Sequence, residues 1–248
     1  MTMSDPNDPH DPHPLDNPGW HALTTVHAEF AEGAGRARRY LADVSVFAAI
    51  DDESDDESDD GSHESWAALA GVVGPGGIAI LYRTTMIAAP KSWTTLDGGP
   101  AHQMLLTTRP AGVPDLPAGA TIRALTTADV PEMLALVKLT KPGPFRPRTI
   151  ALGGYHGVFV DDRLVAMAGQ RTRLPGFTEI SAVCTHPDAR RQGLGAIVTT
   201  RVAADVTARG ETPFLHVAVT NDSARRVYEQ MGFVTRAMVT FAGFAAPA

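Results

Sequence analysis

The chain has 248 residues, of which 44% are hydrophobic and 20% are charged, and it carries a formal net charge of −7. This length exceeds the usual single domain of about 100 to 150 residues, so we expect two domains of modest size. The composition is that of a globular protein, and no stretch approaches the roughly 18 consecutive apolar residues that a membrane span needs. Cys184 is the single cysteine, which excludes an intrachain disulfide and a cysteine-based metal site and fits a reducing compartment.

The first residues and the acidic charge are both local features. Residues 1–13 are rich in Asp, Pro and His and lack the basic start and apolar core of a secretory signal, so we expect a disordered tail in a cytoplasmic protein. Residues 51–64, DDESDDESDDGSHE, hold nine acidic residues, and the rest of the chain is close to neutral. Such like charges repel one another and bury nothing, which predicts a disordered insertion. No basic, aromatic-interleaved patch indicates binding to nucleic acid.

A small α+β domain is expected over residues 14–115. The pattern of apolar residues predicts a helix over 20–40, a strand over 43–50, a helix over 65–73, and strands over 77–83 and 101–107. The segment RPAGVPDLPAGA, residues 109–120, has three prolines and two interior glycines that interrupt any periodicity. We therefore expect the domain junction there.

A second α+β domain is expected over residues 120–248. Its first helix has Thr127 as the candidate N-cap, and its apolar face carries Val130, Met133, Leu134 and Val137. Two apolar runs over 155–169 meet at a polar turn and predict a β-hairpin. A further strand, FTEISAVCT, then leads into a corner that contains two glycines.

This corner, HPDARRQGLGAIVTTRV at residues 186–202, opens a helix predicted over 193–209. The first N–H groups of a helix lack internal partners, and the helix dipole places partial positive charge there, so backbone alone can bind a phosphate. Two arginines add charge, and two glycines remove side chains that would obstruct the backbone: Arg190, Arg191, Gly193 and Gly195. The corner therefore predicts a binding site for a pyrophosphate.

Two common phosphate-binding motifs do not fit this corner. A P-loop needs Gly-x-x-x-x-Gly-Lys-Ser/Thr, and no lysine follows Lys141. A Rossmann fingerprint needs a third glycine where Val198 stands, and it directly follows a strand. The six residues from Arg190 to Gly195 instead match the pattern Arg/Gln-x-x-Gly-x-Gly/Ala.

With this hexapeptide the chain resembles the GNAT superfamily of coenzyme-A-dependent N-acetyltransferases. The strand TEISAVCTHP precedes the hexapeptide, the strand TPFLHVAV follows it, and NDSARRVYEQMGF is similar to the family's Asn-x-x-Ala-x-x-x-Tyr-x-x-x-Gly-Phe ending. The resemblance covers about residues 120–245. It implies an α+β (α/β) GNAT fold with a mixed, largely antiparallel central sheet flanked by helices.

The resemblance implies acetyl-CoA as the co-substrate, and no metal. Backbone groups of Val183 and Thr185 would pair with pantetheine as if it were an extra strand, and Cys184 lies between them in this cofactor segment with its side chain pointing away. Asn221 would contact the cofactor arm. The corner would wrap the pyrophosphate through Arg190, Arg191, Gln192, Gly193, Leu194, Gly195 and Ala196.

The resemblance also implies the catalytic groups. A lysine-like amine is almost wholly protonated at neutral pH, so acyl transfer to it benefits from a base. Glu179 and His216 occupy positions at which different family members carry that base, and the sequence leaves the choice between them open. Tyr228 would protonate the departing thiolate.

Each catalytic candidate has a structural alternative. Tyr228 lies on an apolar helical face and could be packed core with a buried hydroxyl. Glu179 could line a solvated sheet face or pair with Arg171 or Arg173. His216 could be a half-buried histidine with satisfied hydrogen bonds.

The acceptor is a small-molecule amine or an amino-acid-like compound, and neither nucleic acid nor a membrane is expected as a partner. The segment KPGPFRPRT, residues 141–149, falls where the resemblance places the loop that covers the acceptor. Its Arg146 and Arg148, beside Phe145, motivate the hypothesis of a carboxylate-bearing acceptor. A proline-stiffened surface loop with two exposed charges is the alternative.

Two functions stay open at this point. The first is an active N-acetyltransferase in which the amine attacks the thioester directly in a ternary complex. The second is a non-catalytic acyl-CoA-binding or sensory module, which the presence of Asn221 and Tyr228 disfavours. The N-terminal unit lacks the hexapeptide and the Asn…Tyr…Gly-Phe ending, and we interpret it as a degenerate second GNAT-like domain that binds no coenzyme A and packs against the second.

Overall fold

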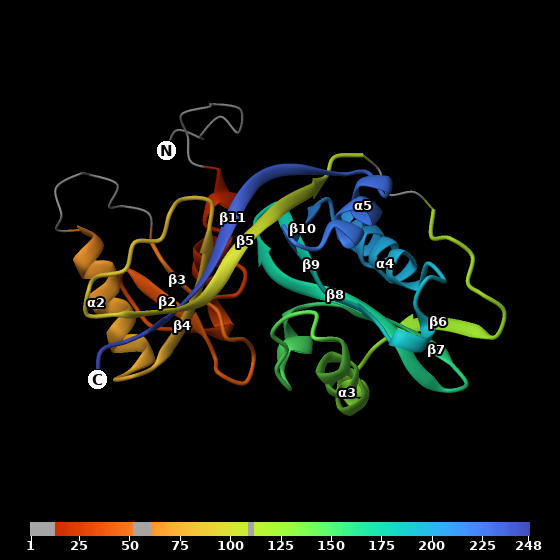
Figure 1. Ribbon diagram of the computed structural model, residues 1–248, viewed down its shortest axis with the longest axis horizontal. Helices are drawn as coiled ribbons and strands as arrows, with labels where there is room; N and C mark the ends of the chain where they lie inside the picture. Colours follow the sequence, from red (N-terminus) through yellow and green to blue (C-terminus); the bar gives the residue numbers. More distant parts are fainter. Residues whose placement is uncertain (1–12, 52–60, 109–111) are drawn as a thin grey trace. The chain divides into compact units, whose positions relative to one another are not determined.

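The computed structural model describes residues 13–51, 61–108 and 112–248. Almost all of the expected disordered tail over 1–13 and most of the acidic insertion lie outside these residues. The chain forms two compact units (Figure 1): unit 1 comprises Met1–Tyr40, Phe47–Pro100 and Met238–Ala248, and unit 2 comprises Leu41–Val46 and Ala101–Ala237. The domain limits expected from the sequence, 14–115 and 120–248, stay a prediction.

Unit 1 is built from short elements. In chain order they are η1 (Pro14–Asp16), α1 (Pro18–Thr24), η2 (Ala28–Phe30), β1 (Ala31–Glu32), β2 (Ala37–Tyr40), β3 (Ala48–Ile50), α2 (Gly61–Val73) and β4 (Ile78–Arg83). The first three strands form an antiparallel sheet in the order β1-β2-β3. The core includes Trp66, whose ring meets those of Trp93 and Phe244 edge to face.

The helix expected over 20–40 is wrong in length. Helix α1 begins where the Asn17 side chain accepts a hydrogen bond from the Trp20 amide (3.4 Å), and it ends at Thr24. The chain then turns through Gly33 and Gly35, whose φ angles of 104° and 59° are left-handed and end any helix. Residues 37–40 pair as β2 instead. The other expected elements of this unit are present, although the strand expected over 43–50 is confined to β3.

The acidic segment departs from the expected insertion at its described ends. Asp51 is buried and accepts hydrogen bonds from Arg36 Nε (3.0 Å) and Ser65 Oγ (2.7 Å). Helix α2 already begins at Gly61. The expectation of a disordered insertion over 51–64 is therefore wrong at these residues, because a carboxylate with cationic and hydroxyl partners can be buried at little cost.

Unit 2 contains most of the larger sheet. Its elements are β6 (Ala120–Ala124), η3 (Thr127–Asp129), α3 (Val130–Thr140), η4 (Thr149–Leu152), β7 (Tyr155–Val160), β8 (Arg163–Leu174), β9 (Phe177–Thr185), η5 (Pro187–Ala189), α4 (Leu194–Ala208), β10 (Thr212–Ala218) and α5 (Asp222–Gln230). Residues of β5 (Thr94–Leu106) and β11 (Phe233–Ala245) belong to both units. From β5 the strand order is β5-β10-β9-β8-β7-β6, and β9 with β10 is the parallel pair among antiparallel neighbours. The predicted mixed, largely antiparallel sheet is confirmed.

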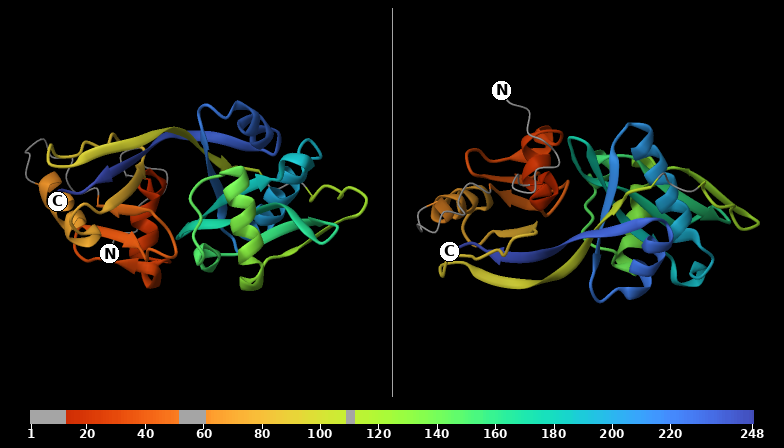
Figure 2. Two further views of the ribbon diagram at one scale, coloured as in Figure 1. Left: turned by 60° about the horizontal axis from the view of Figure 1, so that its bottom comes forward. Right: turned by 90° about the horizontal axis from the view of Figure 1, so that it is seen from above.

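Helices cover both faces of this sheet (Figures 1 and 2). On one face α4 buries the apolar stripe Leu194, Ile197, Val198, Val202 and Val206. On the other face α3 buries Met133 and Leu136 against β7 and β8. Because successive strand residues point to opposite faces, one sheet can supply both cores. Among the described residues, no helix combines the length and the hydropathy needed to cross a bilayer.

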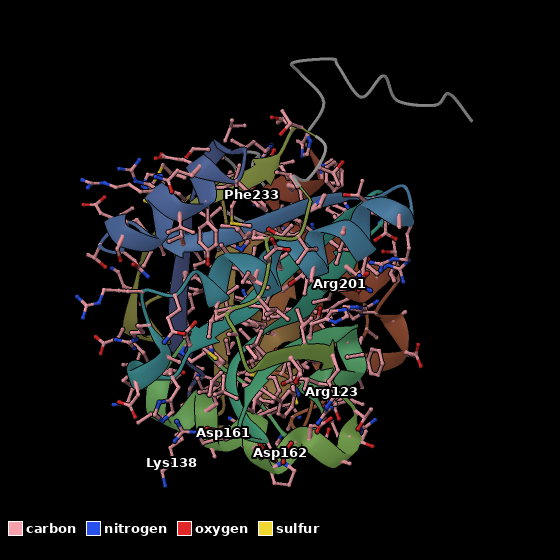
Figure 3. The ribbon with its side chains drawn as sticks, turned by 90° about the vertical axis from the view of Figure 1, so that its right-hand side faces the viewer. Arg123, Lys138, Asp161, Asp162, Arg201 and Phe233 are labelled. Atoms are coloured by element: carbon pink, nitrogen blue, oxygen red, sulfur yellow. The ribbon has the colours of Figure 1, made fainter. Side chains whose placement is uncertain are left out.

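The helix starts that flank the sheet are defined by local hydrogen bonds. The helix expected over 193–209 is confirmed as α4. The N-cap expected at Thr127 is wrong, because Asp129 accepts a hydrogen bond from the Thr126 amide (2.7 Å) and closes a 3-10 turn before α3 begins at Val130. The predicted hairpin is confirmed as β7 and β8, and Asp161 and Asp162 in its turn are labelled in Figure 3.

Candidate active site

The parallel strands β9 and β10 separate part-way along their length. They pair over three residue pairs, the last being Glu179 with Phe214. Beyond this point β9 continues to Thr185 along β8, and β10 continues to Ala218 along β5. Among the residues that the structure describes, the edge of β9 that faces β10 therefore carries backbone groups over 180–185 without a strand partner. An extended, amide-bearing ligand can pair with such an edge.

A β-bulge in β9 determines which side chains flank this edge. Ala182 has a left-handed φ of 53°, and the register with β8 shifts nearby. After the bulge, Val183 packs in the core under α4, whereas Cys184 is buried in the core under α3. Burial raises the pKa of the Cys184 thiol to about 11, so this cysteine stays protonated.

The loop after β9 ends in an open helix N-terminus. Arg191 and Gly193 have left-handed φ angles of 63° and 77°, which turn the chain into α4. Within the described residues, the Ile197 amide donates to the Gly193 carbonyl (3.0 Å) and starts the helical hydrogen bonding. The preceding amides of Leu194, Gly195 and Ala196 are consequently available to a ligand.

The space in front of these amides is open and positively charged. A Cβ atom on Gly193 would meet no heavy atom within 4 Å, and one on Gly195 would meet only Thr185 Oγ1, at 3.6 Å. Two arginines and a glutamine are exposed beside the helix start, namely Arg190, Arg191 and Gln192. The partial charge of the helix dipole adds to theirs. By charge and by space, the corner fits a pyrophosphate.

Asn221 and Tyr228 both belong to α5. The Asn221 Oδ1 atom caps the helix by accepting a hydrogen bond from the Ala224 amide (3.2 Å). Tyr228 is half-buried, and its ring meets that of Phe233, labelled in Figure 3, at a centroid distance of 6.0 Å. Burial, with a smaller contribution from Cys184, raises the pKa of Tyr228 to about 12. The hydroxyl is therefore protonated at neutral pH.

Glu179 and His216 come together where β9 and β10 separate. The Nδ1 atom of His216 lies 2.7 Å from Oε1 of Glu179, and both side chains are buried. Arg171 donates to the same carboxylate through Nε (2.9 Å) and Nη2 (2.5 Å). Burial by itself would raise the pKa of Glu179, but Arg171 and His216 hold it well below its usual range. Of the two pairings considered for Glu179, the structure has the one with Arg171, while Arg173 pairs with Glu211.

The two candidate bases therefore differ in what they can do chemically. A carboxylate whose two oxygens already accept hydrogen bonds from a guanidinium and an imidazole takes up a further proton poorly. An imidazole that is hydrogen-bonded to a carboxylate through Nδ1 presents Nε2 as its basic nitrogen. In this arrangement both oxygens of Glu179 are engaged, and Nδ1 of His216 is bonded to that carboxylate.

The structure adds polar residues that the sequence analysis did not single out. Gln103 on β5 is fully buried, and its Nε2 lies 3.2 Å from Nε2 of His216. Its Oε1 accepts a hydrogen bond from Arg236 Nη1 of β11 (2.8 Å). The Tyr155 hydroxyl on β7 is buried without a hydrogen-bond partner among the described residues. No motif marks these residues; the available signal was the pair His102 and Gln103 before the apolar end of β5.

Residues of the loop over 141–149, which the sequence analysis expected to cover the acceptor, contact other parts of the protein. Arg148 pairs with Asp43 (3.1 Å), and both side chains are about half exposed. Phe145 packs its ring edge against Tyr155, at a centroid distance of 5.7 Å. Arg146 is exposed. Because Arg148 already has a carboxylate partner, the loop offers less free positive charge than its sequence suggests.

Two surface hollows lie apart from these groups. One, of about 460 Å³, is lined by Val113, Ile122, Arg123, Ala124, His156 and Arg201, of which Arg123 and Arg201 are labelled in Figure 3. Its cationic residues face the carboxylates of Asp129 and Asp205. The other, of about 500 Å³, is lined by residues of 125–130 and 147–153. Neither hollow contains a residue of the corner at 186–196.

Comparison with known proteins decides the family. The profile of the FR47-like protein family matches residues 155–241. A solved structure from Novosphingobium aromaticivorans, assigned to the GNAT family of acetyltransferases, is 34% identical, covers 96% of this chain and 100% of its own, and superposes with a TM-score of 0.82. The chain belongs to the GNAT family. The relationship spans nearly the whole chain and is not confined to residues 120–245.

Other GNAT structures share the fold at lower identity. A GCN5-related N-acetyltransferase from Kribbella flavida is 21% identical over 92% of this chain and 93% of its own, with a TM-score of 0.59. A GCN5-related N-acetyltransferase-like protein from Streptococcus suis is 16% identical over 93% and 96%, with a TM-score of 0.54. No curated protein matches the chain. The interpretation of the N-terminal unit as a degenerate GNAT-like domain stays a prediction.

Proposed function

We propose that this GNAT protein is an N-acetyltransferase that moves the acetyl group of acetyl-CoA to a primary amine in a ternary complex. The observation that carries the proposal is the open N-terminus of α4, which the loop over 186–193 connects to the unpaired edge of β9. A nucleotide thioester with an amide-bearing arm needs both features side by side. The corner and the edge come from one continuous segment, residues 180–196.

The residues present fit this co-substrate. The amides of 194–196, with Arg190 and Arg191, would hold the pyrophosphate, and Gln192 and Gly193 would complete the loop around it. The backbone of Val183 and Thr185 would pair with the pantetheine amides. Asn221 would contact the same arm through its Nδ2 group, since its Oδ1 is used as the cap of α5. When bound, acetyl-CoA supplies an activated thioester carbonyl.

The proton transfers are assigned to two side chains. His216 would take the proton of the attacking amine on Nε2, directly or through one water, once the amine or the water has displaced the Gln103 amide from that nitrogen, while Glu179 holds its Nδ1–H. The new N–C bond forms as the C–S bond breaks. Tyr228 would give its hydroxyl proton to the departing thiolate. Burial raises the pKa of Tyr228 to about 12, so the hydroxyl carries its proton at neutral pH but is a weak acid, and the thiolate would have to approach it closely.

The acceptor is proposed as a small-molecule primary amine. A carboxylate on the acceptor receives less support than the loop sequence gave, because Arg148 pairs with Asp43. Arg146 stays available for such a group. A screen of amines with and without a carboxylate, comparing the KM of the chain with that of its Arg146→Ala variant, would decide this point.

The direct test is release of the CoA thiol from acetyl-CoA in the presence of a broad panel of amines. With an accepted amine, His216→Gln and Tyr228→Phe should each lower kcat by about 10² to 10⁴ fold, the usual contribution of a positioned acid or base. His102→Gln serves as the control, because His102 precedes Gln103 on β5 and points to the opposite face.

The same assay separates the two functions that the sequence left open. Turnover with one or more amines supports the transferase. Tight binding of acetyl-CoA with no turnover on any amine would instead identify a binding or sensory module. Full activity in Tyr228→Phe would remove that residue from the mechanism.

A further inference from the structure

A row of polar side chains crosses the sheet where β9 and β10 separate. One residue comes from each of five strands: Arg171 of β8, Glu179 of β9, His216 of β10, Gln103 of β5 and Arg236 of β11. Successive members are hydrogen-bonded, with 2.5 Å between Arg171 Nη2 and Glu179 Oε1, 2.7 Å from Glu179 to His216, 3.2 Å from His216 to Gln103, and 2.8 Å from Gln103 to Arg236. A buried row of this kind must match donors with acceptors along its whole length.

The orientation of the Gln103 amide follows from Arg236. A guanidinium only donates hydrogen bonds, so the Gln103 atom that faces Arg236 must be the carbonyl oxygen. The amide nitrogen of Gln103 then faces Nε2 of His216. The ambiguity between oxygen and nitrogen that usually accompanies a glutamine is removed here by its cationic neighbour.

The orientation of Gln103 in turn determines the state of His216. An amide N–H donates, so Nε2 of His216 must accept and carries no proton. Glu179 is ionised, since its pKa is held well below its usual range by Arg171 and His216 against the effect of burial. The Nδ1 atom of His216 therefore carries the proton and donates it to Glu179. Both ring nitrogens are assigned, and the ring is neutral.

The charges around His216 act in opposite directions. Glu179 on β9 favours an imidazolium, whereas Arg171 on β8 and Arg236 on β11 disfavour it. Protonation of Nε2 would also set two donors face to face across the contact with Gln103. Rotation of the amide would relieve that contact only by turning its NH2 group toward Arg236. The row thus resists the charged form of the ring from both sides.

We propose that Gln103 and Arg236 are positioning residues that hold His216 in the neutral form, with its proton on Nδ1 and with an unprotonated Nε2 that accepts a hydrogen bond from Gln103. The protonation state follows from the hydrogen bonds alone. Its value for catalysis rests on the proposed function.

Histidine ring ¹⁵N chemical shifts of the full-length chain test the protonation state without any assay of activity. The His216 signals are identified by their loss in His216→Gln. At neutral pH we expect a protonated Nδ1 and an unprotonated Nε2. A protonated Nε2 in the unmodified chain at neutral pH would overturn the proposal.

Two variants test the positioning residues. Arg236→Met removes the donor that orients Gln103 together with a positive charge, and the uptake of a proton at Nε2 should move to higher pH. Gln103→Glu places an acceptor oxygen opposite Nε2 with little change of shape, and His216 should become doubly protonated at neutral pH. Arg163→Met in the β7–β8 hairpin makes the same change of charge away from His216 and should leave the titration unchanged. A titration of Arg236→Met that overlays that of the unmodified chain would contradict the proposal.

The kinetic readout separates this inference from the proposed function. If His216 is the base, the acidic limb of the kcat/KM profile should move with the NMR titration in each variant, and Gln103→Glu should lose at least about tenfold in kcat/KM at neutral pH and regain it at higher pH. If the NMR titration moves and the rate profile does not, the positioning role holds and His216 is not the base. If the NMR titration stays fixed, the positioning role fails whatever the rates are.

Discussion

At the scale of single residues, Tyr155 carries a hydroxyl that the fold buries without a hydrogen bond among the described residues. Its ring lies against the backbone of Gly169, where a Cβ atom would come within 2.1 to 2.3 Å of ring carbons. Burial raises the pKa of Tyr155 well above its usual range, so the group is a neutral phenol. An unpaired buried hydroxyl costs about 1 to 3 kcal/mol.

Tyr155→Phe should therefore leave the free energy of unfolding unchanged or raise it by up to about 1 kcal/mol, because it removes an unpaired polar atom and keeps the ring. Denaturant unfolding of the ligand-free chain measures this difference. The matched control is Tyr40→Phe, since the Tyr40 hydroxyl is bonded to Nδ1 of buried His27 at 2.9 Å. That variant should lose about 1 to 3 kcal/mol. Equal losses in both would show that Tyr155 has a partner after all.

At the scale of elements, the N-terminus of α4 has room for a larger side chain in the ligand-free protein, whereas a negative charge there would oppose the binding of a phosphate. A Cβ atom on Gly195 makes only ordinary contact with Thr185, so the fold should accept a larger residue there. Gly195→Glu should unfold at nearly the same temperature as the unmodified chain when no ligand is present. The variant should lose the stabilisation by acetyl-CoA, which is about 2.7 kcal/mol at one hundred times Kd, because its carboxylate stands where phosphate binds.

Thermal unfolding with and without acetyl-CoA checks this prediction. Gly195→Gln is the control for size, since it has the same length without the charge. If Gly195→Glu were stabilised by acetyl-CoA as much as the unmodified chain, the pyrophosphate would have to bind elsewhere.

The stability of the start of α3 should depend on pH. Hydrogen bonds from Arg123 lower the pKa of Asp129 well below its usual range, against the effect of burial, and bonds from Thr126 add to the shift. A carboxyl with a lowered folded-state pKa contributes stability above its unfolded pKa of about 3.9 and loses that contribution as the pH falls toward the folded value.

Asp129→Asn should accordingly lower the free energy of unfolding by about 1 to 2 kcal/mol at neutral pH, a modest figure because Arg123 is half exposed. The difference from the unmodified chain should shrink below about pH 4. Urea unfolding at a series of pH values measures it. If the difference in free energy of unfolding between the two proteins stayed constant down to pH 3, the charge of the Asp129 carboxylate would not be what stabilises the turn before α3.

At the scale of the whole molecule, the number of nucleotide sites separates the two units. Unit 1 contains neither the hexapeptide of the corner nor the Asn…Tyr…Gly-Phe ending. Calorimetric titration with acetyl-CoA should therefore give one equivalent per chain, and Gly195→Glu should give none. Two equivalents, or one that survives in Gly195→Glu, would assign a site to unit 1 and would contradict the interpretation of that unit as a degenerate domain.

The sequence by itself determined the larger sheet and the helix that the corner at 186–196 opens. Both follow from local sequence patterns. The alternation of apolar residues over 155–185 predicts strands of the sheet, and the glycines and arginines of 190–195 mark the corner. Such patterns involve residues that are close together in the sequence, so the elements they specify can be predicted without knowing which distant residues pack against them. The failures in unit 1 have the same origin. The helix expected over 20–40 followed the apolar pattern and overlooked Gly33 and Gly35, and the insertion expected from residue 51 overlooked the distant partner Arg36.

Only the tertiary structure showed how Glu179 and His216 are bonded. The pattern of β9 allowed Glu179 a solvated face, whereas the fold buries it against Arg171 and His216. Gln103, which contacts His216, lies 113 residues before it in the sequence. Arg236, which contacts Gln103, lies on the later strand β11. Protonation depends on which donors and charges surround a group in space, and strands that are far apart in sequence supply them here. For this reason the sequence identified Glu179 and His216 as candidates, whereas their hydrogen-bond partners became visible only in the packed strands.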